Sequence, residues 1–439
     1  MSVEEIVKDL RNEMESIYSR KECLSEKLFV LCSHCKKRII DSIVEDEYLA
    51  IKNDCRECQP SRQELTDQVT KLFEELQFGR EELQRDLQNR ANRKSLIAIL
   101  YGVFSNGPNV PLSFPQVCSF ELTYRCNLKC KHCYIGTPPT TQEMDTKSAL
   151  QAIEKIAETG FVGIPLSGGE PLLRNDLLSL AKETKSYDMD VILSTNGTLL
   201  SQDRAKELRP YVDVACISLD SHVESIHDNF RGLEGAQKMT LKGIKNCLDN
   251  DIPVRIFTTL TKFNHEKLPE LINFIVELGV KEIALFDLNL VGRGCNIGQE
   301  FQLTLEEFKK SATALLGLKN QSAARVDVLA PFNFIKDDQY VNKLTLLSGG
   351  FCNAGISTLN ISPDGEIQPC SRVRINLGNV LTDNLKEIWK DSPALKALRD
   401  RERLKGTCGK CEYKYVCGGC RANAYAEHSD YLMEDPRCM

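Results

Sequence analysis

The chain has 439 residues, of which 42% are hydrophobic and 27% are charged. This composition is typical of globular proteins with a large core and excludes a chain that is mainly disordered or collagen-like. Its 56 Lys and Arg and 62 Asp and Glu residues leave a net charge of −6, which argues against a protein built mainly to hold nucleic acid.

We expect no membrane span. The longest apolar stretch, Ser95 to Phe104, is shorter than the ~18–20 residues that a spanning helix needs. The chain begins Met-Ser-Val-Glu-Glu, with acids where a signal peptide carries basic and then apolar residues. The sequence therefore predicts a cytoplasmic protein.

The cysteines are unusually many. A cytoplasmic chain of this size does not need 19 cysteines for structural disulfides, so their spacing indicates that they bind metals. So many metal-binding thiols are also typical of a protein that functions under anaerobic conditions. The first region, residues 1–105, has apolar residues at helical spacing and carries two Cys-x2-Cys pairs. These pairs fit a four-thiolate zinc ribbon, although a rubredoxin-like iron uses the same ligands, which are Cys32, Cys35, Cys55 and Cys58.

The second region, residues 112–305, follows a turn-rich boundary and alternates short apolar runs with helical patterns. We expect strands at 118–123, 163–167, 190–195, 213–219, 252–260 and 282–289, with helices near 146–159, 174–187, 201–209, 235–249 and 265–279. Such an alternation predicts an α/β fold with a parallel sheet, a partial (β/α)6 TIM-like barrel. Chemistry in such barrels lies at the carboxyl ends of the strands.

Three cysteines stand on one short loop directly after the first of these strands: Cys126, Cys130 and Cys133. Three thiolates can hold three irons of a [4Fe–4S] cluster and leave the fourth iron open to a cofactor or substrate. A zinc site that lacks one ligand, or a set of buried thiols, is the simpler alternative.

Polar motifs follow the next three strands. The second is followed by Gly168-Gly169-Glu170, the third ends in Ser194-Thr-Asn196, and the fourth ends in Ser218-Leu-Asp220, after which come His227 and Arg231. The two glycines have no Cβ, so a ligand can come close to their backbone, and the Glu170 carboxylate can bind a cationic group. Ordinary strand-ending turns, and a surface salt bridge of small value for Arg231, are the alternatives.

Together these motifs resemble those of the radical S-adenosylmethionine (radical SAM) enzymes, over roughly residues 116–300. The resemblance implies that Cys126, Cys130 and Cys133 ligate a catalytic cluster whose open iron chelates SAM, which is then cleaved to a 5′-deoxyadenosyl radical. It also implies that His132 packs near the adenine, that Ser218 meets the ribose, and that the remaining SAM contacts come from Gly168, Gly169, Glu170, Ser194, Asn196 and Arg231.

The last region, residues 306–439, is expected to begin with a helix, Glu306 to Leu318, and then to be irregular and held by metals. Its seven cysteines resemble the SPASM domain, which carries up to two auxiliary [4Fe–4S] clusters. By that resemblance one cluster is held by Cys408, Cys411, Cys417 and Cys438. The other is held by Cys352, Cys370 and Cys420, with a fourth position that is open or filled by Cys295; a pair of zinc sites is the alternative.

The resemblance implies a radical SAM/SPASM enzyme that oxidatively modifies a C–H bond of a peptide or protein. One alternative is the modification of tetrapyrrole side chains of a haem precursor, or of another cofactor or lipid. A non-catalytic iron–sulfur protein for electron relay is an alternative of another class. The electron donor implied by the resemblance is a flavodoxin or ferredoxin, and nucleic acid is not an expected partner.

Overall fold

The computed structural model describes residues 117–137, 140–304, 306–308, 310–311, 324–329, 352–411, 414 and 417–438. The chain divides into two compact units, Met1–Gln116 and Val117–Met439, and every described residue belongs to the second unit. The predicted helical domain and its four-cysteine site (Cys32, Cys35, Cys55 and Cys58) lie outside the described residues.

The described strands form one sheet in the order β7-β6-β5-β4-β3-β2-β1-β8-β9. Its strands are parallel apart from β9, which runs antiparallel to β8. The strands are β1 (Val117–Thr123), β2 (Gly163–Gly168), β3 (Asp190–Thr195), β4 (Val214–Ser218), β5 (Val254–Leu260), β6 (Glu282–Asp287), β7 (Arg325–Leu329), β8 (Thr358–Ile361) and β9 (Ile367–Gln368). The first six confirm the predicted strands, and the parallel α/β fold is confirmed with them.

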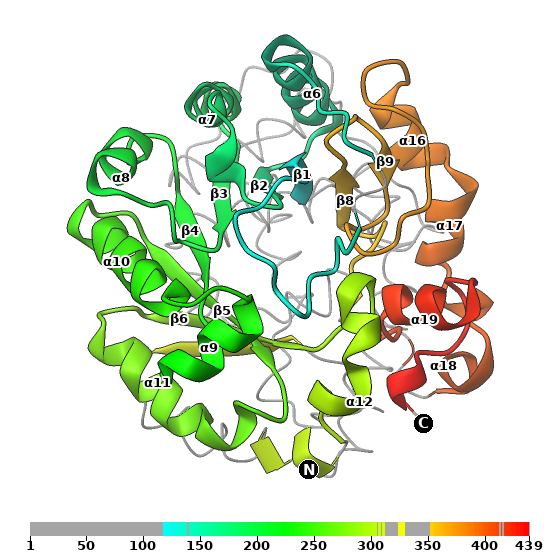
Figure 1. Ribbon diagram of the computed structural model, residues 1–439. Coiled ribbons are helices and arrows are strands. Elements are labelled where there is room, and N and C mark those ends of the chain that lie inside the picture. The colour runs from blue at the N-terminus through cyan, green and yellow to red at the C-terminus, as the bar shows by residue number, and fades with distance from the viewer. Residues whose placement is uncertain are drawn as a thin grey trace, which may run out of the picture. The chain divides into compact units, whose positions relative to one another are not determined.

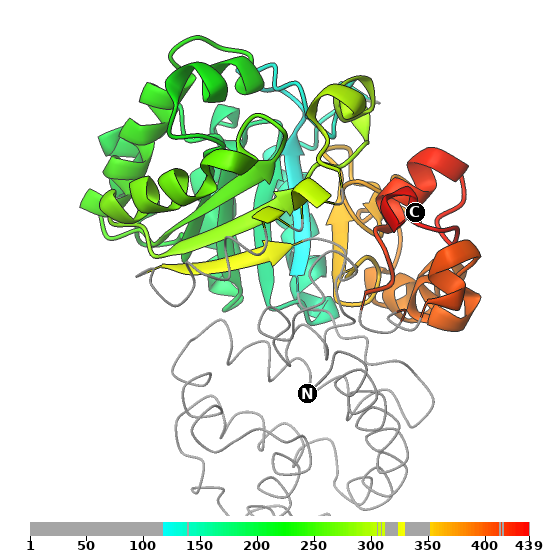
Figure 2. The ribbon, with the colours of Figure 1, turned by 90° about the horizontal axis from the view of Figure 1, so that it is seen from below.

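Helices follow these strands and form an arc outside the sheet, while the loop after β1 crosses the end of the sheet (Figures 1 and 2). The helices of this part are α6 (Thr146–Thr159), α7 (Leu177–Ser186), α8 (Gln202–Leu208), α9 (Glu224–Arg231), α10 (Ala236–Asp249), α11 (Leu268–Glu277) and α12 (Gly298–Phe301). Short 3-10 turns are η1 (Pro171–Leu173), η2 (His265–Lys267) and η3 (Gly292–Asn296). The five predicted helices are confirmed; α9 was not expected as a separate helix.

The helix α6 shows how local sequence and core packing agree. Its first turn is capped by the Asp145 carboxylate, which accepts a hydrogen bond from Ser148 N, and it ends at Gly160 in the left-handed conformation. Its apolar residues recur every three or four positions, and Ala149, Ile153 and Ile156 are fully buried in the core cluster that also contains the strand residues Phe120 and Leu122.

The C-terminal region is more regular than the sequence predicted. It contributes β8, β9, α16 (Leu385–Asp391), α17 (Pro393–Arg399), η5 (Arg401–Arg403), α18 (Gly406–Lys410), α19 (Arg421–His428) and η6 (Pro436–Cys438). Residues 306–308 and 310–311, the described part of the predicted helix Glu306 to Leu318, are helical. The strand β8 pairs in parallel with β1, from Val117↔Thr358 to Phe120↔Ile361. A four-residue strand carries too little pattern to be recognised alone, and this pairing stabilises it.

None of the helices in the described part of the chain is both long enough and apolar enough to span a membrane.

One close contact anchors α10 to the loop after β3. A Cβ built on Gly243 would lie 2.1 Å from the carbonyl oxygen of Gly197. We expect Gly243→Ala to destabilise the protein by about 1–3 kcal/mol through overpacking, although alanine favours a helix more than glycine does. Chemical denaturation followed by circular dichroism measures the change, with exposed Lys242→Ala on the same helix as the control. Equal stability of the two variants would contradict the prediction.

Candidate active site

The cysteines of the CxxxCxxC loop (residues 126–133) lie at the carboxyl end of β1. Cys126 is exposed, Cys133 is half-buried and Cys130 is buried, and all three are free thiols. Distant segments hold the loop through its backbone: Lys131 N donates to Phe230 O at 2.9 Å, and Arg293 N donates to Cys133 O at 2.9 Å. The Arg293 side chain also donates from Nε to Cys130 O at 2.8 Å.

Nitrogen donors face two of the loop's sulfur atoms. Cys126 Sγ lies 3.4 Å from Leu128 N and 4.0 Å from Asn196 Nδ2. Cys130 Sγ lies 3.9 Å from Arg231 Nη1. Such donors favour the thiolate form that ligates iron, and they tune the potential of a cluster held there.

The glycine pair after β2 lies directly against this loop. A Cβ on Gly168, whose φ is +121°, would lie 2.3 Å from Thr123 O, and one on Gly169 would lie 2.2 Å from Arg125 O. Gly169 N donates to Thr123 O at 2.7 Å. Only glycine permits this approach, which places the Gly-Gly-Glu motif beside the cysteines.

Glu170 is fully buried and fastens the turn after β2 to the end of β3. Its carboxylate accepts hydrogen bonds from Leu172 N at 3.2 Å, Thr195 Oγ1 at 2.7 Å and Asn196 N at 2.9 Å. Burial raises its pKa to about 7, although these donors oppose the shift. Its expected contact with the methionyl ammonium stays a prediction.

The other strand-end residues stand on the same edge of the sheet. Asn196 bridges towards the loop by donating from Nδ2 to Asn127 Oδ1 at 2.9 Å. Its own Oδ1 accepts from Thr198 N at 2.9 Å. Ser194 is the last residue but one of β3, Ser218 ends β4, and both residues are half-buried. Their expected contacts with SAM stay predictions.

Arg231 forms a buried ion pair, so the alternative of a surface salt bridge is wrong. Its Nε donates to Asp220 Oδ2 at 2.7 Å, and the two side chains are 9% and 1% exposed. Burial by itself would raise the pKa of Asp220, but the charge of Arg231 lowers it below the ordinary value. Thr259 N donates to the second oxygen of Asp220 at 3.0 Å.

His132 stacks on Phe230, with ring centroids 4.0 Å apart and an interplanar angle of 12°. Burial, reinforced by the charge of Arg231, lowers its pKa to about 3, so the ring is neutral. Its buried Nδ1 has no hydrogen-bond partner among the described residues. The expected packing near the adenine stays a prediction.

Four C-terminal cysteines line one small cavity of about 40 Å³: Cys408, Cys411, Cys417 and Cys438. We call them the four-cysteine group. Cys408 Sγ accepts from Arg421 Nη2 at 3.4 Å and from Asp435 N at 3.3 Å, and Cys417 Sγ accepts from Gly419 N at 3.4 Å. The structure thus gathers the same four thiols that the resemblance assigned to one cluster.

Cys352, Cys370 and Cys420 form the three-cysteine group. Burial raises the pKa of both Cys370 and Cys420, and the nearby Cys352 raises each further. The neighbour of Cys420 Sγ is Asn289 Oδ1, at 3.5 Å, whereas exposed Cys295 contacts Leu290 O at 2.9 Å. In the part of the chain described, no three Cys, His, Asp or Glu side chains gather closely enough to bind a single metal ion.

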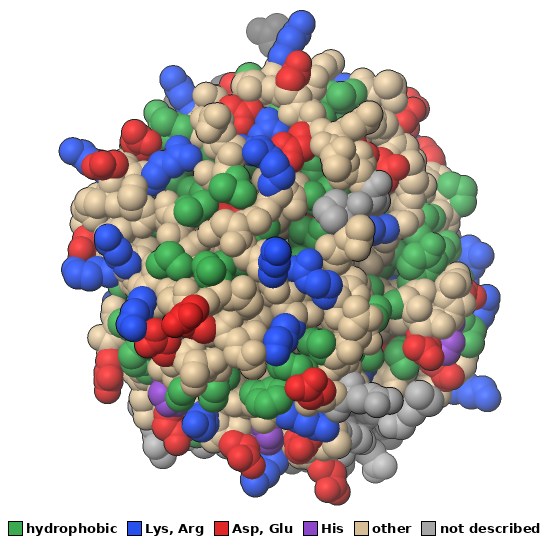
Figure 3. Space-filling view, in the orientation of Figure 1, with side chains coloured by type: hydrophobic (Ala, Val, Ile, Leu, Met, Phe, Trp, Pro, Cys, Tyr) green, Lys and Arg blue, Asp and Glu red, His purple; other side chains and the backbone are tan. Residues whose placement is uncertain are grey.

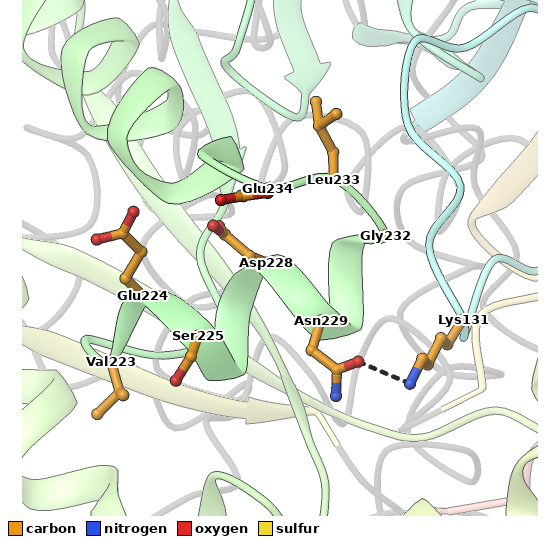
Figure 4. A pocket seen from close by; sticks show the side chains of 9 residues that line it. All are labelled: Lys131, Val223, Glu224, Ser225, Asp228, Asn229, Gly232, Leu233 and Glu234. Carbon is orange, nitrogen blue, oxygen red and sulfur yellow. Dashed lines mark hydrogen bonds between the residues drawn. The ribbon is translucent and has the colours of Figure 1, made fainter.

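The face that carries the CxxxCxxC loop has Lys and Arg side chains near its centre (Figure 3). Exposed Arg125 and Lys129 and half-buried Lys131 belong to this loop or adjoin it. Lys131 Nζ donates to Asn229 Oδ1 of α9 at 2.9 Å, at the rim of an open depression of about 740 Å³ (Figure 4). Glu224, Asp228 and Glu234 also line the depression, and none of the loop's cysteines does.

Sequence reasoning did not single out Arg293 or Phe230. Both contact the loop from segments about 100 or more residues away, through the backbone or by stacking, and no local motif marks such contacts. Asp220 was noticed, but its partner was not identified. Arg372 and Arg374 were also missed, although the alternation Cys370-Ser-Arg372-Val-Arg374 is visible in the sequence.

Comparisons with known proteins agree with this geometry. Residues 120–275 match the radical SAM superfamily, and residues 352–412 match SPASM, an iron–sulfur cluster-binding domain. An AdoMet-dependent heme synthase of Methanosarcina barkeri is 33% identical over 339 residues, which cover 74% of this chain and 96% of that protein. A PqqA peptide cyclase of Gluconobacter oxydans is 26% identical, covering 75% of this chain and 91% of that protein. The crystal structure of Streptococcus suis SuiB bound to S-adenosylmethionine matches with a TM-score of 0.65 at 20% identity, over 85% of this chain and 87% of that one.

The chain therefore belongs to the radical SAM superfamily and carries a C-terminal SPASM domain, and it is an enzyme. Its cofactors are SAM and a [4Fe–4S] cluster, with auxiliary iron–sulfur clusters in the SPASM domain. The donor sets fit these groups: free thiols on one loop beside a glycine cradle, and seven further thiols in two groups. The comparisons give no support to the zinc site predicted at residues 32–58.

Asp220→Asn leaves the Arg231 charge buried without its partner. We expect a loss of about 3–5 kcal/mol in the free energy of unfolding. Chemical denaturation measures it, and Asp249→Asn, which breaks the exposed Lys245–Asp249 pair, is the control with a loss below about 1 kcal/mol. Similar losses in both variants would show that the Asp220–Arg231 pair does not stabilise the fold.

Glu170 makes stability depend on pH. Its folded-state pKa, about 7, lies above the ordinary value of 4.5, so the folded protein binds the proton more tightly. This contribution is complete below pH 4.5 and is lost as pH rises through 7, by about 3 kcal/mol in all. In the absence of SAM, raising the pH from 5 to 8 should lower the stability of Glu170→Gln less than that of the wild type. Thermal unfolding at several pH values measures the difference. Exposed Glu158→Gln is the control, and parallel pH profiles would refute the prediction.

Proposed function

We propose that this enzyme oxidatively modifies the side chains of a tetrapyrrole, a haem precursor. The observation that carries the proposal is the 33% identity to a heme synthase over nearly the whole of that protein. The comparisons favour this alternative over the peptide or protein substrate that the sequence analysis placed first.

The arrangement of the described residues supports an oxidation. When bound, the [4Fe–4S] cluster and SAM supply a 5′-deoxyadenosyl radical, which removes a hydrogen atom from an unactivated C–H bond. The chain supplies the rest: the loop presents three thiols, the turn after β2 brings a carboxylate, and the two C-terminal cysteine groups would hold auxiliary clusters, which could accept an electron. Buried Glu170 and half-buried His132 border this region.

A peptide substrate is the second candidate. The likeness to a PqqA peptide cyclase favours it, although at 26% identity. A non-catalytic electron-relay protein receives no support from the comparisons. The electron donor, flavodoxin or ferredoxin by resemblance, stays a prediction.

The test is anaerobic formation of 5′-deoxyadenosine from SAM by the holoenzyme with dithionite. We expect an iron porphyrin that carries propionate side chains to increase the rate of 5′-deoxyadenosine formation. We also expect a porphyrin product of changed mass. If a peptide fraction increases 5′-deoxyadenosine formation and none of the porphyrins does, the proposal is overturned.

The same assay tests the catalytic thiols. Simultaneous replacement of Cys126, Cys130 and Cys133 by Ala should abolish SAM cleavage, because the cluster loses its ligands on the loop. The control is Cys247→Ala, which removes a buried thiol of the α10 helix. Retained cleavage in the triple variant would refute the mechanism.

A further inference from the structure

Two arginines of the C-terminal region lie beside the CxxxCxxC loop. They belong to the run Cys370-Ser-Arg372-Val-Arg374, which leaves the three-cysteine group after Cys370. Val373 between them is fully buried, and its N–H bonds back to Cys370 O at 3.0 Å. Arg372 stands in the turn that this bond closes and Arg374 directly follows Val373, and both arginines are half-buried.

Each guanidinium lies over a tyrosine that borders the loop. Arg372 Cζ is 5.6 Å from the centre of the Tyr134 ring, and Arg374 Cζ is 5.6 Å from the centre of the Tyr124 ring. Arg374 Nη2 also donates to Ile135 O at 3.3 Å. Tyr134 directly follows the last cysteine of the loop, and Tyr124 stands two residues before the first. The arginines are therefore held against the catalytic loop.

The same segment reaches the auxiliary thiols. Arg372 is near enough to Cys370 and Cys420 for its charge to lower the pKa of both, against the larger effect of burial. The two arginines thus occupy the region between the CxxxCxxC loop and the three-cysteine group. A substrate that is oxidised here has to reach the loop and lie near an auxiliary site.

Within the described part of the chain, the charges of the two arginines are not offset by an ion pair. Neither arginine has a carboxylate oxygen within ion-pair distance among the described residues. The buried acid close to them is Glu121, whose oxygens accept from Tyr134 Oη at 2.8 Å and Asn360 Nδ2 at 3.2 Å. Burial raises the pKa of Glu121, although the charge of Arg374 opposes this, so Glu121 is a poor partner for Arg374. Asp364 and Glu366 also lie near enough to Tyr124, the ring beneath Arg374, to raise its pKa, but neither forms an ion pair with Arg374 among the described residues.

We propose that Arg372 and Arg374 bind the carboxylates of the substrate's acidic side chains and position it between the two sites. This rests on the proposed function and specifies its chemistry: the propionates of a tetrapyrrole are the anions. A guanidinium donates two parallel hydrogen bonds to a carboxylate, and the tyrosine rings keep each fork oriented.

The test compares two ligands, an iron porphyrin with free propionates and its methyl ester, which has no carboxylate. Dissociation constants for the holoenzyme are measured by absorbance titration. Arg372→Gln and Arg374→Gln should each weaken binding of the free acid by about 10- to 100-fold and leave that of the ester unchanged. Lysine variants should recover part of the loss, and exposed Arg209→Gln is the matched control.

The outcomes separate the two proposals. If the wild type binds neither porphyrin, the proposed function fails and this inference with it. If the wild type binds the acid and the glutamine variants bind it equally well, only the inference fails. An equal loss for acid and ester, or loss of an auxiliary cluster signal in electron paramagnetic resonance, would show that the arginines support the fold or the cluster, and would also overturn the inference.

Discussion

The architecture depends on holding a loop that has almost no regular structure of its own. The CxxxCxxC loop has to present three thiols in one arrangement, and buried backbone groups need partners. These partners come from the turn after β2, from the end of α9 and from η3 after β6. Each contact comes from the carboxyl end of a strand or from the helix that follows it. Because the strands are parallel, their carboxyl ends lie along one edge of the sheet. The sheet therefore determines the conformation of the loop.

Charged side chains also surround the CxxxCxxC loop. Arg231 faces Cys130 Sγ and is kept in place by Asp220, so that a positive group stands where thiolates carry negative charge. Glu170 has a pKa of about 7 in the absence of a ligand. A cationic ligand group placed near it would favour its ionised form, and the binding of such a ligand near neutral pH would release a proton.

The SPASM region is built into the barrel instead of standing apart from it. β8 extends the sheet at the free edge of β1, the strand that leads into the CxxxCxxC loop (Figure 1). At the other end, Arg437 of the C-terminal tail forms a buried pair with Asp287 at the end of β6. The cysteine groups are thereby fixed relative to the catalytic loop, which an enzyme needs if one substrate is to reach both.

Local pattern was enough to predict the six strands, the five helices and the cysteine motifs, because strand alternation, helical periodicity and ligand spacing are properties of short segments. The grouping of Cys408, Cys411, Cys417 and Cys438 came from resemblance, and the structure brings those thiols to one cavity. Tertiary structure alone decided that Arg231 pairs with Asp220, that β8 joins β1, and that Arg372 and Arg374 face Tyr134 and Tyr124. Those contacts join segments separated by up to some 250 residues. The course of the chain between them determines such contacts, and no local pattern records that course.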